Sequence, residues 1–318
     1  MKNKTTLDRM NMDRIKMDKP CRTMLSVPGN NKKMHAGAAA SNADAIMLDL
    51  EDSVPADQKE AARKTVIDSL LSLDFNSKRV DLRINSLDTP FAYKDLIQVA
   101  EAACDSFDTI VVPKVNHEGD IHFVSRFLDG VEMALGQKRQ IRIQACIETA
   151  QGLFRIKEIA RADSRISSLA FGIADYQTSI GAGLVSLSGH GENEEQVYPG
   201  HRWHFPISRM VMAAKANGLV ALDAPYGNFK DADGLKKSAA LAKALGCDGK
   251  WVIHPDQIDT VNQVFTPSKE EIQRARQILE AKNARPRGAV AVDGRMVDFA
   301  TMRLAQKVWD QAVFLGQV

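Results

Sequence analysis

Short apolar runs alternate with amphipathic stretches along most of this chain. Apolar runs bounded by turn residues are typical of buried strands. In the stretch 57–71, Ala62, Val66, Ile67 and Leu70 share one face at helical spacing, which predicts an amphipathic helix. Comparable helices are expected near 32–40, 93–103, 118–135, 152–162, 206–218 and 233–245. The expected strands are Arg22–Val27, Ala45–Leu50, Val80–Ile84, Thr109–Val112, Ile141–Thr149, Ser168–Asp175, Leu219–Asp223 and Lys250–Ile253.

Eight successive strand–helix units predict an α/β fold, a closed (β/α)₈ TIM barrel over residues 21–266. A doubly wound open sheet is the rival, but eight evenly spaced units are unusual for it. Neither G-x-G-x-x-G nor a Walker A motif occurs, which disfavours dinucleotide binding.

Residues 267–318 form an extension after the expected barrel. Ser268 and Glu271 make a capping box for a helix to about Lys282. The stretch 283–295 is rich in Gly, Pro and Arg and is expected to be a linker, and a last helix is expected over 299–314. An extension this short has to pack on its own barrel or on that of a neighbouring subunit.

Composition narrows the function classes. The 318 residues are 44% hydrophobic and 26% charged, which is ordinary for a soluble enzyme. A net charge of +2 gives no reason to expect a nucleic-acid or membrane partner. Residues 1–20 are polar and read as a mobile arm, not a secretory signal. The cysteines form no C-x-x-C and indicate a reduced, cytoplasmic location; they are Cys21, Cys104, Cys146 and Cys247.

Two of the apolar runs end in a carboxylate, Glu148 in the fifth strand and Asp175 in the sixth. In a barrel, the C-terminal ends of the strands meet at one rim, where active sites are built. Two acids there suit Mg²⁺, which usually takes one or two protein carboxylates. The alternative is that each acid caps the next helix or pairs with an arginine.

The other polar residues expected at this rim are acids and bases. Convergence of such groups is typical of a catalytic site. Arg83 has the planar geometry to bind a substrate carboxylate, although a salt bridge to Glu51 or Asp52 is the alternative. Glu51 and Asp52 are candidates for holding metal-bound water or moving a proton. The rim set is Glu51, Asp52, Arg83, Lys114, Glu148, Asp175, Asp223 and His254.

Two further signals compete with a magnesium site. Lys114 at a strand end could form a Schiff base, which is the metal-free route to aldol chemistry. His190, His201 and His204 lie in or near a Gly-rich loop over 181–205, where H-R-W-H has zinc-like residue types. No cysteine or acid supplies a third ligand at motif spacing, so a solvated loop with ordinary histidines is favoured. Metal, arginine and carboxylates together fit a small 2-oxo acid, whose carbonyl the ion polarises.

Ordered motifs from about Arg22 to the C-terminus resemble the citrate-lyase-beta-like acyl-CoA lyases of the HpcH/HpaI aldolase superfamily. Within it, the likeness is greatest to malyl-CoA and β-methylmalyl-CoA lyases. The motifs are R-T-M-L-S-V-P-G-N-N, D-A-I-M-L-D-L-E-D-S-V-P, L-R-I-N, V-V-P-K-V, I-E-T-A-Q-G-L, F-G-I-A-D-Y, G-K-W-V-I-H-P-D-Q-I and G-A-V-A-V-D-G-R-M-V-D.

The resemblance implies Mg²⁺, or Mn²⁺ in its place, held by Glu148 and Asp175, and an acyl-CoA substrate. It implies that Arg83 binds the oxo-acid carboxylate and that Ala174-Asp175 and Ile253-His254 touch substrate. Asp298 would be the catalytic acid/base, laid over the site by the extension of a neighbouring subunit in a trimer or hexamer. After the P-G turn, Asn30-Asn31 precede Lys32, so the expected coenzyme A contact at Lys32 is shifted relative to many relatives.

The function predicted from the resemblance is reversible Claisen-type cleavage of malyl-CoA or β-methylmalyl-CoA to glyoxylate plus acetyl-CoA or propionyl-CoA. The alternatives are a malyl-CoA thioesterase, a citramalyl-CoA lyase, and a citrate lyase beta subunit acting on an acyl carrier protein.

Overall fold

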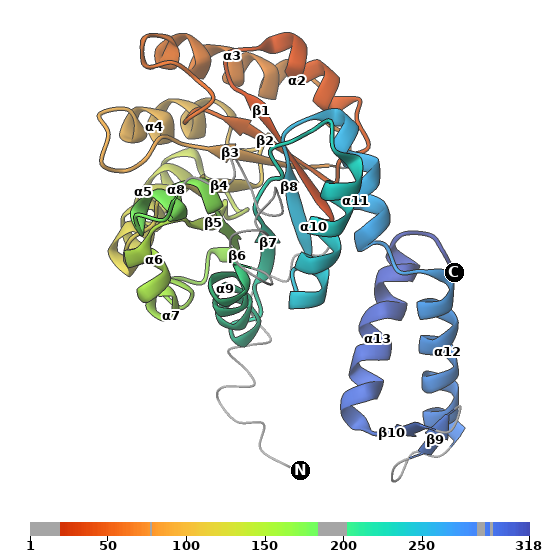
Figure 1. Ribbon diagram of the computed structural model, residues 1–318. Helices are drawn as coiled ribbons and strands as arrows, with labels where there is room; N and C mark the ends of the chain where they lie inside the picture. Colours follow the sequence, from red (N-terminus) through yellow and green to blue (C-terminus); the bar gives the residue numbers. More distant parts are fainter. Residues whose placement is uncertain (1–19, 77, 184–201, 285–289, 293–294) are drawn as a thin grey trace. The chain divides into compact units, whose positions relative to one another are not determined.

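Eight parallel strands close into a barrel in the computed structural model, which describes residues 20–76, 78–183, 202–284, 290–292 and 295–318. Each strand pairs with the next along the chain, and β8 returns to β1 (Figure 1). The (β/α)₈ prediction is confirmed. The strands are β1 (Thr23–Pro28), β2 (Ala45–Asp49), β3 (Arg79–Arg83), β4 (Thr109–Val112), β5 (Arg142–Ile147), β6 (Ile166–Phe171), β7 (Val220–Asp223) and β8 (Gly249–Val252).

Helices follow the strands and surround the barrel, as the amphipathic stretches predict (Figure 1). Their buried residues recur at helical spacing, for example Leu96, Val99, Ala100 and Ala103 in one helix. The helices are α2 (Lys32–Ala39), η1 (Ala56–Gln58), α3 (Lys59–Ser72), α4 (Ala92–Ala103), α5 (Glu118–Leu135), α6 (Ala150–Phe154), α7 (Ile156–Ile159), α8 (Ile173–Ser179), α9 (His204–Ala216), α10 (Ala232–Leu245), η3 (Pro255–Gln257) and α11 (Ile258–Phe265).

The sixth strand is shorter than predicted. It ends at Phe171, and Asp175 lies in the first turn of α8 instead of at a strand end. Ile173 and Tyr176 are buried three residues apart, so this apolar run contains a strand and then a helix. The prediction of two strand-end acids is therefore wrong for Asp175 and correct for Glu148, which directly follows β5.

Smaller differences have local causes. The helix expected over 152–162 is divided into α6 and α7 at Arg155. Helix α9 begins at His204, two residues before the expected Pro206, because proline is tolerated in the first turn, where backbone N–H groups have no helical acceptor. Residues 255–265 form η3 and α11, which the sequence analysis did not predict.

The chain divides into two compact units, Met1–Asn262 and Gln263–Val318. In the second unit, α12 (Lys269–Ala284) and α13 (Phe299–Phe314) pack together around Ala275, Ile278 and Ala305. Ser268 and Glu271 exchange the two hydrogen bonds of the predicted capping box. The expected linker contains β9 (Val290–Val292) and β10 (Arg295–Val297), which pair antiparallel, so that expectation is wrong in part.

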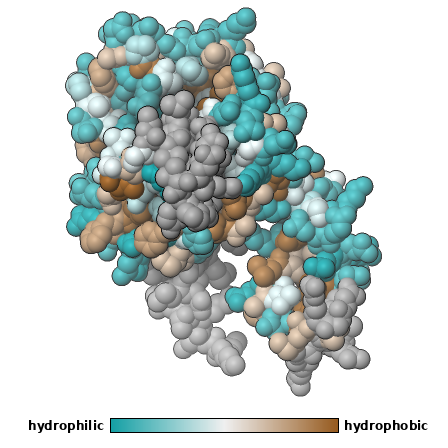
Figure 2. All heavy atoms as spheres, in the orientation of Figure 1, coloured by the Kyte–Doolittle hydropathy of each residue, from teal (hydrophilic) through white to brown (hydrophobic). Residues whose placement is uncertain are grey.

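Inward-facing apolar residues of the strands fill the barrel. Met24 illustrates the packing, because its backbone neighbours are Ala45 on β2 and Trp251 on β8, and all three belong to one buried cluster. All four cysteines are buried free thiols, as the sequence indicated. On the face shown in Figure 2, hydrophobic side chains lie among hydrophilic ones. In the part of the chain that the structure describes, no helix combines the length and apolarity needed to cross a membrane.

Candidate active site

A buried arginine–aspartate pair forms the floor of the candidate site. Arg83, the last residue of β3, donates from Nε and Nη2 to the two oxygens of Asp49 at 2.6 and 2.7 Å. Asp49 ends the neighbouring strand β2 and is fully buried. Burial by itself would raise the pKa of Asp49, but the charge and hydrogen bonds of Arg83 outweigh it and lower that pKa. Asp49 is thus a fixed anion that orients the guanidinium.

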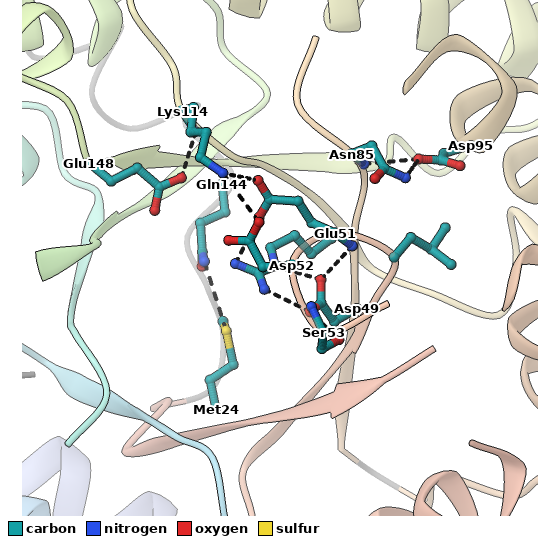
Figure 3. Close-up of polar contacts among 12 residues, drawn as sticks. Met24, Asp49, Glu51, Asp52, Ser53, Asn85, Asp95, Lys114, Gln144 and Glu148 are labelled. Atoms are coloured by element: carbon teal, nitrogen blue, oxygen red, sulfur yellow. Dashed lines mark hydrogen bonds and ion pairs between the residues drawn. The ribbon is translucent and has the colours of Figure 1, made fainter. Parts of the chain in front are cut away.

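Glu51 links this pair to the rest of the site. Its Oε2 lies 3.0 Å from Arg83 Nη1, and its Oε1 accepts a hydrogen bond from Lys114 Nζ at 2.6 Å (Figure 3). The carboxylate is nearly buried, and burial raises its pKa even though two cations lie beside it. The backbone carbonyls of Leu50 and Glu51 accept hydrogen bonds from the buried Lys59 ammonium, which fixes this segment in place.

Lys114 lies among acids from three different segments of the chain. Besides Glu51, its ammonium approaches Asp52 at 3.4 Å and Asp175 at 3.7 Å. Its backbone N–H donates to Glu148 Oε1 at 2.7 Å (Figure 3). Lys114 has a φ of 50°, in the left-handed region that residues with a Cβ rarely adopt. Backbone strain of this kind persists only where surrounding contacts hold it, and it is concentrated at functional sites.

Glu148 is the most strongly perturbed of these acids. Burial, followed by the charges of Glu51 and Asp175, raises its pKa to about 8. Burial also raises the pKa of Asp175, although Lys114 opposes this. Gly172, between β6 and α8, makes room for Glu148: a Cβ at this glycine would lie 2.2 Å from Glu148 Oε2. Carboxylates with raised pKa values that share one space are typical of sites where a cation or a proton is exchanged.

The balance of charge fits a divalent cation. We call Asp49, Glu51, Asp52, Glu148 and Asp175 the acid cluster. Its contacts include the cations of Lys59, Arg83 and Lys114, so five carboxylates face three positive charges and an excess of two negative charges remains when all are ionised. The described residues contain no group of three histidine, cysteine or acidic side chains arranged as metal ligands. Two carboxylates with water and substrate in the other positions satisfy Mg²⁺.

Sequence reasoning missed two residues of this site, Asp49 and Gly172. Asp49 was placed inside an expected strand that continued to Leu50, although an acid within the apolar run A-I-M-L-D-L is itself a signal of a buried charge with a partner. Gly172 left no signal in the sequence, because the contact it allows is made with a strand distant in the chain. The alternative considered for Arg83, a salt bridge to Glu51 or Asp52, is present for Glu51, and Asp49 is a second acid paired with this arginine.

The other predicted site residues each have surroundings of their own. Asp223 is buried against Lys250 of β8, with 2.5 Å between Oδ2 and Nζ. His254 is the N-cap of η3, and its ring stacks on Phe229 with 4.8 Å between centroids. Three residues proposed to touch substrate are exposed: Lys32 at the start of α2, Ala174 in α8 and Ile253 after β8.

Asp298 belongs to the second unit. It is the N-cap of α13, and its Oδ1 accepts hydrogen bonds from the backbone N–H and the hydroxyl of Thr301 at 2.9 Å. The hydrogen bonds to Thr301 lower its pKa, and it is exposed in this chain. His204 begins α9, whereas His190 and His201 lie outside the described residues.

Comparisons with known proteins identify the family. The family model of HpcH/HpaI aldolase/citrate lyase matches residues 22–255. The chain belongs to this family. It is a carbon–carbon lyase, and several of its relatives are named as lyases of CoA thioesters.

One such relative is L-malyl-CoA/beta-methylmalyl-CoA lyase of Cereibacter sphaeroides, 37% identical over 94% of this chain and 96% of that protein. Another is malyl-CoA/beta-methylmalyl-CoA/citramalyl-CoA lyase of Chloroflexus aurantiacus, 34% identical over 94% of this chain and 90% of that protein. Among solved structures, CitE from Mycobacterium tuberculosis in complex with magnesium, acetoacetate and coenzyme A is 30% identical, with a TM-score of 0.75 and coverage of 92% and 98%.

Proposed function

We propose that this lyase cleaves a 3-hydroxyacyl-CoA of the malyl-CoA and β-methylmalyl-CoA class, reversibly and with Mg²⁺ bound. The products would be glyoxylate and acetyl-CoA or propionyl-CoA. The single observation that supports the metal most directly is the acid cluster with its excess of negative charge around Glu148 and Asp175. The names of the relatives support the substrate class.

Each residue of the site has a role in this proposal. Glu148 and Asp175 would hold Mg²⁺, which supplies Lewis-acid polarisation of the oxygen that becomes the glyoxylate carbonyl. Mn²⁺ would serve in its place, since it accepts the same oxygen ligands. Arg83 directs two of its five N–H donors to Asp49, and its Nη1 forms an ion pair with Glu51 Oε2 at 3.0 Å. The guanidinium, oriented by Asp49, would present the remaining N–H groups to the carboxylate of the oxo acid.

Proton transfer needs a base for the substrate hydroxyl. The hydroxyl proton leaves to that base, the bond between C2 and C3 breaks, and its electron pair passes to the thioester as an enolate. Protonation at C2 then gives the acyl-CoA product. Asp298 from a neighbouring subunit is the proposed acid/base, and Glu51 and Asp52 are the alternatives within the barrel. Assembly as a trimer or hexamer is part of this proposal, as are contacts of Lys32, Ala174, Ile253 and His254 with the acyl-CoA.

The test is product analysis with purified protein, Mg²⁺ and a panel of malyl-CoA, β-methylmalyl-CoA and citramalyl-CoA. Glyoxylate and acetyl-CoA or propionyl-CoA in equal amounts are the expected products from the first two substrates. Pyruvate and acetyl-CoA from citramalyl-CoA alone would reassign the acyl group. Free CoA with intact malate would indicate hydrolysis of the thioester and would overturn the lyase assignment for these substrates. Full turnover in excess chelator would overturn the role of the metal.

A further inference from the structure

Lys114 has more contacts with the acid cluster than a simple ion pair requires. Its ammonium lies 2.6 Å from Glu51 Oε1, 3.4 Å from Asp52 Oδ1 and 3.7 Å from Asp175 Oδ1. The ammonium is a compact positive charge with acidic groups on several sides, as a bound metal cation would be. Asp175 is shared between this ammonium and the proposed metal.

The backbone of Lys114 holds a second acid of the same site. Its N–H donates to Glu148 Oε1 at 2.7 Å, while Glu148 Oε2 lies on the side of Gly172. The left-handed φ of 50° allows the residue to direct its N–H at Glu148 and its side chain at Glu51. The left-handed conformation is unfavourable for a lysine, and the two hydrogen bonds, to Glu148 and Glu51, offset this cost.

We propose that the Lys114 ammonium is a built-in counter-cation that competes with the divalent metal for the acid cluster and thereby sets the metal affinity. The inference rests on the proposed function, because it assumes that Glu148 and Asp175 bind the metal. Without metal, the ammonium offsets the repulsion among Glu51, Asp52 and Asp175. With metal present, it is confined to Glu51 and Asp52, which it keeps away from the metal. Lys114 is therefore a positioning residue.

Competition has a consequence for binding that a purely structural role does not have. Removal of the ammonium leaves one more uncompensated negative charge beside the metal, and at the effective dielectric of a partly buried site this strengthens cation binding by more than a factor of ten. A lysine that only supported the fold would, when lost, weaken binding or leave it unchanged.

The experiment is a calorimetric titration of the full-length protein with Mg²⁺ alone. Lys114→Met is expected to bind Mg²⁺ at least tenfold more tightly than the wild type. Lys114→Gly removes the same ammonium and relaxes the left-handed backbone, so it should fold at least as well and bind more tightly too. Lys64→Met is the matched control: it changes the net charge equally, but Lys64 is exposed and pairs with Glu60 on its own helix, so Mg²⁺ affinity should be unchanged.

Unchanged or weaker Mg²⁺ binding by folded Lys114→Met and Lys114→Gly would overturn the competition. Wild-type protein that binds no Mg²⁺ would overturn it as well. Because substrate is absent from the titration, the first result leaves the proposed cleavage intact, and cleavage is measured separately by its products.

Discussion

Gly172→Ala tests whether the proposed metal site depends on the space that Gly172 leaves for the Glu148 side chain. The backbone of Gly172 has a φ of −112° and a ψ of 99°, which alanine adopts freely, so only the space around the new methyl group matters. That methyl would lie 2.2 Å from Glu148 Oε2 and 2.6 Å from Glu148 Cβ. Real Cβ atoms do not approach other atoms closer than 3.0 Å, so the carboxylate has to move by about 0.8 Å or more.

A rotation of the Glu148 side chain cannot relieve the whole overlap. Its Cβ is fixed by the backbone directly after β5, so either that backbone or α8 has to shift. Displacement of a reacting or binding group by about 1 Å costs on the order of a hundredfold in rate. We therefore expect Gly172→Ala to lower kcat/KM for malyl-CoA about a hundredfold and Mg²⁺ affinity at least tenfold. Overpacking should cost about 1–3 kcal/mol of stability.

The assay combines Mg²⁺ calorimetry, cleavage kinetics at saturating Mg²⁺ and urea unfolding. Gly37→Ala is the control, because Gly37 is exposed within α2 and a Cβ there would have no neighbour within 4 Å. It should leave kinetics unchanged and raise stability by about 0.5–1 kcal/mol. Wild-type Mg²⁺ affinity and turnover in folded Gly172→Ala would refute the placement of Glu148 as a metal ligand.

Three further predictions concern charge, metal and pH. Asp49→Asn removes the anion paired with the buried Arg83 guanidinium and should cost about 3–5 kcal/mol in urea unfolding, whereas a loss below 1 kcal/mol would show that Asp49 does not compensate Arg83. At a hundredfold excess of Mg²⁺ over its Kd, wild-type protein should gain about 2.7 kcal/mol of stability, and Glu148→Gln should gain almost none; an equal gain in both proteins would exclude Glu148 as a ligand. Burial lowers the pKa of His35, whose neutral ring bonds Ser69 and the carbonyl of Pro28. This stabilisation is complete above the ordinary histidine pKa of about 6.5 and declines as the pH falls below it, so His35→Asn should flatten stability against pH between about 5 and 7 in urea unfolding.

The boundaries of the strands and helices show how far local patterns extend. Helix α5 and strand β4 have the bounds that the sequence predicts, because each pattern is long or clearly interrupted by turn residues. The run S-L-A-F-G-I-A-D-Y has the apolar pattern of one long strand, but its residues form a strand before Gly172 and a helix after it. Periodicity over nine residues does not separate the two.

The sequence predicted which types of residue form the candidate site, but not which acid contacts which base. Glu148, Asp175, Arg83 and Glu51 were recognised because acids and bases next to apolar runs are costly unless they have a function or a partner. The partners themselves were not predictable. Lys114 and Glu51 are 63 positions apart in the sequence, and Asp49 and Arg83 are 34 apart.

The sequence by itself determined the order of the eight barrel strands and of most helices between them, and it marked Arg83 and Glu148 as charges at strand ends, because both follow from short-range alternation of apolar and polar residues. Only the closed barrel decided that Asp49 accepts the hydrogen bonds of the Arg83 guanidinium and that Gly172 leaves room for Glu148. It also decided that Lys114 adopts a left-handed backbone conformation beside the acids. The reason is physical: electrostatic energies and steric contacts depend on distances of a few ångströms between residues that are remote along the chain, and closure of the sheet sets those distances.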